Sequence, residues 1–62
     1  MPLVTIKILE GRTTEQKRGM VKDVTNAITK NIGCHPDTVQ IDIVEMKKEN
    51  YAVGGIIWID NH

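Results

Sequence analysis

Residues 2–12, PLVTIKILEGR, contain the stretch that decides the fold. Between residues 3 and 9 the side chains alternate, and Val4, Ile6 and Ile8 fall on one face of an extended chain. The opposite face is mixed and carries Leu3, Thr5, Lys7 and Leu9. This alternation predicts a strand with one strictly apolar face, so we expect that face to be the one that packs against the rest of the fold.

A helix is expected after a short loop at residues 10–12. Thr13 and Gln16 have the spacing of a capping box, in which each side chain bonds to the backbone N–H of the other residue. The apolar residues that follow recur at helical spacing and form one stripe: Met20, Val21, Val24, Ala27, Ile28 and Ile32. The charged residues, Lys17 among them, are expected to point elsewhere. Gly33 supplies the glycine that commonly follows a helix end.

Alternation returns from Thr38 to Val44, with Val39, Ile41 and Ile43 on one face, and this predicts a second strand. A strand, an amphipathic helix and a strand in this order predict a right-handed βαβ unit with parallel strands. Parallel sheets are usually covered on both faces, whereas one helix covers only one face. We therefore expect other copies of the chain to complete the sheet.

The C-terminal part of the chain has a different pattern. Gly54 and Gly55 suit a tight turn or hairpin, because glycine readily adopts positive φ. Residues 56–59, IIWI, are apolar without helical spacing, and we expect them to pack against a neighbouring subunit. The expected fold class is therefore α/β: a single βαβ unit with a short C-terminal hairpin, assembled into an oligomer, with residues 1–62 forming one domain.

Composition argues against several classes of protein. The chain has eight basic and eight acidic residues, so no basic surface for nucleic acid is expected. No apolar run approaches the roughly 20 residues needed to cross a bilayer. Cys34 is the only cysteine, which excludes an internal disulfide, and no metal-ligand spacing is present. We expect a cytoplasmic protein that uses no metal or cofactor and has no nucleic-acid or membrane partner.

Pro2 has two interpretations. It could simply begin an edge strand, where the missing N–H of proline costs nothing. Alternatively, Met1 could be removed, as an initiator methionine commonly is when the second residue is small. Its removal would expose a secondary amine held rigidly by its ring and by the strand that follows. Such an amine could accept and return a proton. Taken alone, Pro2 favours the structural role.

The wider sequence resembles the 4-oxalocrotonate tautomerase family, whose members have a processed N-terminal proline followed by an alternating strand. Residues 8–12, ILEGR, match a family segment, and residues 14–17, TEQK, are similar to its helix start. Glu45-Met46 and residues 51–55, YAVGG, fall at the spacing of its closing segment. The resemblance spans nearly the whole chain without a gap, and the order, spacing and length of the motifs together make it specific.

This resemblance implies an isomerase built as a homohexamer, a trimer of dimers, of βαβ subunits. Pro2 would be both base and acid in the keto–enol tautomerisation of a small enol or dienol acid such as 2-hydroxymuconate. Arg12 would be a catalytic residue that holds a substrate carboxylate, a task suited to its planar guanidinium. Leu9, Tyr51 and Val53 would form apolar pocket walls, which lower the pKa of the Pro2 amine by desolvating its cation.

Gln40 departs from the family pattern. It stands where the family has a second substrate-binding arginine, donated from the second strand of a neighbouring subunit, and it brings no charge. Its face of the strand suits a substrate-binding residue and an ordinary polar residue equally well. If the charge is missing, the affinity for a dicarboxylate should fall, unless Lys7, Lys47 or Lys48 substitutes for it.

Two other functions stay open. A dehalogenase-like or decarboxylase-like relative would use Pro2 as a cationic acid, although Gln40 removes charge where those relatives add it. A non-catalytic oligomeric module would use the same apolar pocket only to hold a small ligand. A retained Met1 would favour that module, because the Pro2 nitrogen would then be an amide and not a base.

Overall fold

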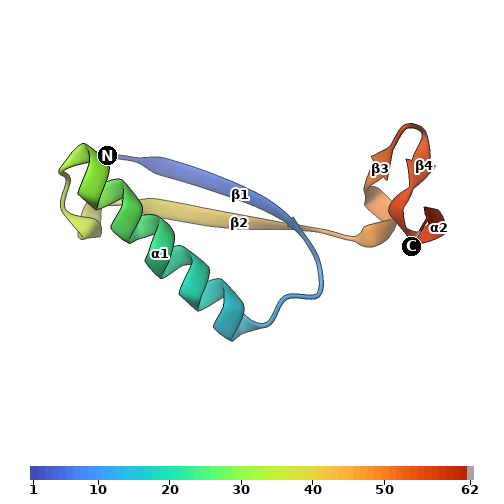
Figure 1. The fold of residues 1–62 in the computed structure, drawn as a ribbon, viewed down its shortest axis with the longest axis horizontal. Helices are drawn as coiled ribbons and strands as arrows, with labels where there is room; N and C mark the ends of the chain where they lie inside the picture. Colours follow the sequence, from blue (N-terminus) through green and yellow to red (C-terminus); the bar gives the residue numbers. More distant parts are fainter. Residues whose placement is uncertain (62) are drawn as a thin grey trace.

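The computed structural model describes residues 1–61, and Figure 1 shows the order of their elements. The N-terminal part forms β1 (Leu3–Leu9), α1 (Thr14–Ile32), the 3-10 turn η1 (Pro36–Thr38) and β2 (Gln40–Met46). The C-terminal part forms the 3-10 turn η2 (Lys48–Asn50), β3 (Ala52–Val53), β4 (Ile56–Ile57) and the short helix α2 (Trp58–Asn61). β1 pairs with β2 in parallel and β3 with β4 antiparallel, which confirms the βαβ unit with a C-terminal hairpin.

α1 runs back alongside the β1–β2 pair and covers one face of it (Figure 1). The alternating apolar side chains of the two strands are half-buried on this face: Val4, Ile6 and Ile8 of β1, and Ile41 and Ile43 of β2. The opposite face is open. There the Thr5 hydroxyl donates a hydrogen bond to the Asp42 carboxylate at 2.8 Å, between residues that are partners in the strand register.

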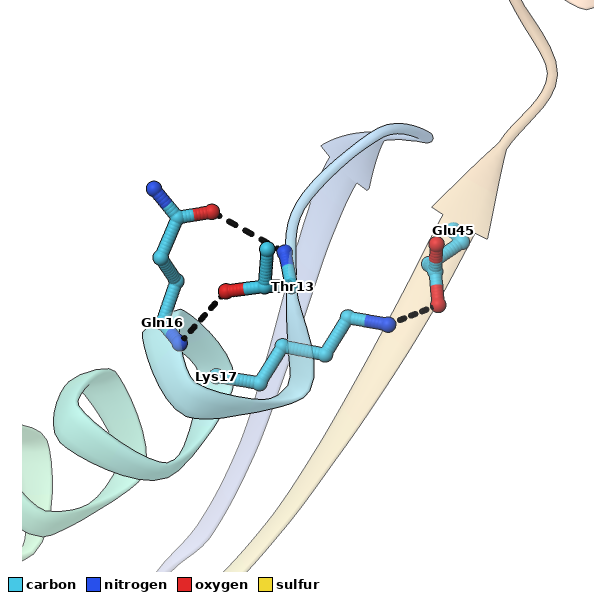
Figure 2. Close-up of polar contacts among 4 residues, drawn as sticks. All are labelled: Thr13, Gln16, Lys17 and Glu45. Atoms are coloured by element: carbon cyan, nitrogen blue, oxygen red, sulfur yellow. Dashed lines mark hydrogen bonds and ion pairs between the residues drawn. The ribbon is translucent and has the colours of Figure 1, made fainter.

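The predicted capping box fixes the start of α1. The Gln16 backbone N–H donates to Thr13 Oγ1 at 3.1 Å, and the Thr13 backbone N–H donates to Gln16 Oε1 at 2.9 Å (Figure 2). At the other end Gly33 adopts a φ of 80° and donates its N–H to the Thr29 carbonyl at 2.9 Å. Both ends of the helix are therefore where the sequence predicts them.

The apolar stripe of α1 is confirmed for four of its residues, which are half-buried: Met20, Val21, Val24 and Ile28. Ala27, at the edge of the stripe, and Ile32, in the last turn, are exposed. The expectation for Lys17 is wrong, because this side chain is half-buried on the covered face. It precedes Met20, Val21 and Val24 by three, four and seven residues, which are the intervals that share one side of a helix.

β2 begins two residues later than the sequence predicts, at Gln40 rather than Thr38. Local hydrogen bonds hold the preceding segment in η1: the Thr38 N–H donates to the His35 carbonyl at 3.0 Å, and the Val39 N–H donates to the Pro36 carbonyl at 3.1 Å. These bonds use the N–H groups of Thr38 and Val39 within the turn. The strand also continues past Val44, to Met46.

The predicted hairpin forms at Gly54 and Gly55, whose φ values are 62° and 84°. Residues 56–59 are divided between two elements, because β4 ends at Ile57 and α2 begins at Trp58. The Trp58 N–H donates to the Tyr51 carbonyl at 2.8 Å, and the two rings lie 5.7 Å apart, tilted by 55°. Together these contacts close the C-terminal segment on itself.

This C-terminal segment extends beyond the end of the β1–β2 pair (Figure 1), and the chain is elongated as a result. The radius of gyration is 14.8 Å, whereas a compact domain of this length would have about 10.5 Å. No residue that the structure describes is buried, and Leu3, Val53 and Ile56 are 73%, 61% and 50% exposed. One copy of the chain therefore encloses no core of its own.

Candidate functional site

Pro2 and Gln40 lie together at the start of the parallel strand pair. The Gln40 backbone N–H donates to the Pro2 carbonyl at 3.0 Å, and Leu3 is the register partner of Gln40. The Gln40 amide nitrogen lies 3.5 Å from the sulfur of Met1. Pro2 is half-buried, while Gln40 and Met1 are exposed. The bond to Gln40 fixes the backbone that carries the Pro2 nitrogen.

Arg12 lies at the other end of β1, in a loop that is anchored on both sides. Before it, the Glu10 N–H donates to the Met46 carbonyl at 2.9 Å, and the Glu10 carboxylate accepts a hydrogen bond from the Lys48 N–H at 3.1 Å. Gly11 has a φ of 113°, a backbone conformation that residues other than glycine rarely adopt. After Arg12 the capping box of Thr13 begins the helix. Arg12 is thus carried on a short, doubly fixed turn.

The Arg12 side chain borders a hollow of about 250 Å³ between this turn, β1 and the first turns of α1. Five residues line the hollow: Ile8, Arg12, Gln16, Lys17 and Met20. Ile8 and Met20 contribute apolar wall, while Arg12 has no hydrogen bond or ion pair within the described residues 1–61. An unpaired guanidinium beside an apolar wall suits a small organic molecule that carries a carboxylate.

Lys17 shares this hollow, but its charge is already paired. Figure 2 shows the Lys17 side chain reaching from α1 to Glu45 near the end of β2, where the ammonium forms an ion pair with the carboxylate. Sequence reasoning did not identify this pair. The position of Lys17 within the apolar stripe of the helix was the signal that could have found it.

The proposed site residues are not all brought together in one chain. Pro2 and Arg12 flank the two ends of β1, which lie roughly 20 Å apart for a strand of this length. Leu9 is at the Arg12 end, where it pairs with Met46. Tyr51 and Val53 belong to the C-terminal segment beyond that end, with Tyr51 half-buried against Trp58 and Val53 exposed. A site that contains both Pro2 and Arg12 thus requires more than one copy.

Other reactive side chains have local roles. His35 caps η1, because its Nδ1 accepts the Asp37 N–H at 3.2 Å. Within residues 1–61 there is no group of three or more His, Cys, Asp or Glu side chains that could hold a metal ion. None of the helices in this part of the chain is both long and apolar enough to span a membrane.

Comparison with known proteins relates almost the whole chain to tautomerases. A family model described as "Tautomerase enzyme" matches residues 2–58. The 2-hydroxymuconate tautomerase of Bacillus subtilis strain 168 is 49% identical over 55 residues, which cover 89% of each chain.

Solved structures show the same relationship. A structure of the 4-oxalocrotonate tautomerase isozymes from Methylibium petroleiphilum is 37% identical, with a TM-score of 0.92, and the match covers 97% of this chain and 94% of the other. A heterohexamer 4-oxalocrotonate tautomerase from Chloroflexus aurantiacus is 31% identical over the full length of both chains, with a TM-score of 0.93. With one fold, one family model and this level of identity along almost its whole length, the chain belongs to the 4-oxalocrotonate tautomerase family and is an isomerase.

Proposed function

We propose that the chain interconverts the enol and keto forms of a small 2-hydroxy-dienoate or related enol acid, with the amine of Pro2 as base and acid once Met1 has been removed. The observation that carries this proposal is the placement of Pro2 directly before β1, with its carbonyl held by Gln40. Membership of the family and the 49% identity to a 2-hydroxymuconate tautomerase support the substrate class.

The proton transfer needs only one group. The neutral Pro2 amine takes the proton from the enol hydroxyl, while the oxygen lone pair forms the carbonyl and the conjugated double bonds shift along the chain of the substrate. The carbon that gains electron density then takes the proton back from the Pro2 ammonium. The amine is regenerated, and no redox partner is required.

The amine must be uncharged for the first step. An ordinary α-amino group has a pKa of about 7.7–8.0, so much of it is protonated at neutral pH. In the assembled site, apolar walls would desolvate the cation and so lower the pKa of the Pro2 amine, and an Arg12 guanidinium brought from a neighbouring chain would act in the same direction. Each unit of depression corresponds to about 1.4 kcal/mol of interaction with the surroundings.

The proposed site is completed by assembly into a homo-oligomer, which we propose to be a hexamer. The accessible surface of one chain is 4896 Å², whereas a compact monomer of this mass would expose roughly 4,000 Å². Most of the exposed large apolar residues lie on the open sheet face and on the C-terminal segment: Leu3, Val44, Val53, Ile56, Ile57 and Ile59. Burial of these residues by neighbouring copies supplies the missing core and brings Arg12 of one chain to Pro2 of another.

Three measurements test this proposal. Mass spectrometry of the protein made in its natural host should show loss of Met1. The processed protein should ketonise 2-hydroxymuconate and phenylenolpyruvate, and Pro2→Ala should lower kcat by about 100-fold or more, the usual contribution of a general base. Light scattering should give a mass several times that of one chain. A retained Met1, a fully active Pro2→Ala variant or a stable monomer would each contradict it.

A further inference from the structure

Lys17 and Glu45 are charged residues at positions that the fold otherwise gives to apolar side chains. Lys17 lies in phase with Met20 and Val21 on the covered face of α1, and Glu45 follows Ile43 on the covered face of β2. Their side chains are 25% and 41% exposed and form an ion pair between helix and sheet (Figure 2). An ion pair with this exposure contributes little to stability. A role in the adjacent hollow therefore explains these two charges better than stabilisation does.

Glu45 sits close to the hollow that Arg12 borders. It is the register partner of Ile8, whose side chain forms part of the apolar wall. A Glu45 carboxylate without Lys17 would attract a free cation, and Arg12 is the cation of the lining that has no partner within residues 1–61. A bond to Glu45 would occupy the guanidinium donors that a substrate carboxylate needs.

We propose that Lys17 is a positioning residue that acts through Glu45: by holding the Glu45 carboxylate, it keeps the Arg12 guanidinium free for the carboxylate of the substrate. This inference rests on the proposed function, in which Arg12 holds that carboxylate. It predicts that the charge of Glu45 harms substrate binding only when Lys17 is absent.

A double-mutant cycle with phenylenolpyruvate, a monocarboxylate, tests the inference. Lys17→Met should raise KM by about tenfold with little change in kcat, because uniform binding is lost. The double variant Lys17→Met with Glu45→Gln should return KM to within about twofold of the parent protein. Glu45→Gln alone should not raise KM, because it removes the carboxylate that could bond to Arg12, and the conservative Lys17→Arg should keep KM close to that of the parent protein. Lys22→Met, which removes a charge from an exposed position of α1 outside the hollow, is the matched control.

The outcomes distinguish failure of this inference from failure of the proposed function. An unchanged KM in Lys17→Met overturns the inference, and so does a KM that stays high in the double variant, because Lys17 would then bind the substrate itself. Arg12→Gln serves as the reference. If Arg12→Gln leaves KM unchanged, the role of Arg12 in the proposed function fails. If Arg12→Gln raises KM and Lys17→Met does not, only the role of Lys17 fails.

A second measurement needs no activity. The Nε–H resonance of Arg12 in the substrate-free protein should shift in Lys17→Met, because Glu45 then bonds to the guanidinium. It should return to its original position in the double variant with Glu45→Gln. An Arg12 resonance that is the same in the parent protein and in Lys17→Met would overturn the inference.

Discussion

The Glu10 carboxylate accepts a hydrogen bond from the Lys48 backbone N–H at 3.1 Å and so joins the turn that carries Arg12 to the segment after β2. The Glu10 N–H also donates to the Met46 carbonyl, which adds a second connection at the same place. One acidic residue therefore connects the candidate carboxylate-binding arginine to the base of the C-terminal segment.

Replacement of Glu10 by alanine should loosen this turn. The Lys48 N–H would lose its partner. A hydrogen bond to a charged group contributes about 1.5–3 kcal/mol to stability, and we expect a loss no larger than this at an exposed position. We expect KM for a carboxylate substrate to rise about fivefold because Arg12 is less well positioned. Glu10→Gln, which keeps an acceptor oxygen, should retain most of the binding. An Ala variant with unchanged KM would show that the turn holds Arg12 without Glu10.

Loss of the capping box should destabilise α1 from its first turn. Thr13→Ala removes the acceptor for the Gln16 N–H, and N-cap replacements of this kind cost about 1 kcal/mol. Chemical denaturation followed by circular dichroism, at one fixed protein concentration because assembly contributes to stability, measures the effect. Thr14→Ala, one residue later in the first turn, is the control and should be close to neutral. Equal losses in the two variants would contradict the assignment of Thr13 as the cap.

The sequence predicts the local structure well where short-range patterns act alone. The alternation from Leu3 to Leu9 and the pairing of Thr13 with Gln16 each depend on neighbours in the sequence, and both are confirmed. The start of β2 was misplaced because the hydrogen bonds of η1 compete with strand pairing over the same backbone groups. α2 escaped notice because four residues carry too little periodicity to predict a helix.

The candidate site was harder to predict than the fold. That Gln40 lies beside Pro2 follows from the register of β1 and β2, which the alternation alone does not specify. That Arg12 lies at the opposite end of β1 from Pro2 follows from the length of that strand, so a site that contained both residues would need more than one chain. The Lys17–Glu45 pair joins α1 to β2, and a pattern within either segment cannot show its partner.

The neutral side chain of Gln40 should limit the use of dicarboxylates. Gln40→Arg places a guanidinium beside Pro2, where it can hold a second carboxylate in bidentate fashion. We expect KM for 2-hydroxymuconate to fall about tenfold relative to KM for phenylenolpyruvate, the monocarboxylate. Gln40→Met, which keeps a side chain of similar length and adds no charge, should not change this ratio. A ratio that is the same in Gln40→Arg and in the parent protein would mean that residue 40 does not face the substrate.

The separation of Pro2 and Arg12 along β1 predicts that two impaired variants restore activity when they share an assembly. Pro2→Ala and Arg12→Gln subunits, unfolded together in equal amounts and then refolded, should form mixed oligomers. If each site takes Pro2 from one chain and Arg12 from another, about a quarter of the sites will contain both intact residues. The measurement is the ketonisation rate of the mixture, with each variant refolded alone as the control. If one chain supplied both residues, every site would lack one of them, and the mixture would be no more active than the sum of its parts.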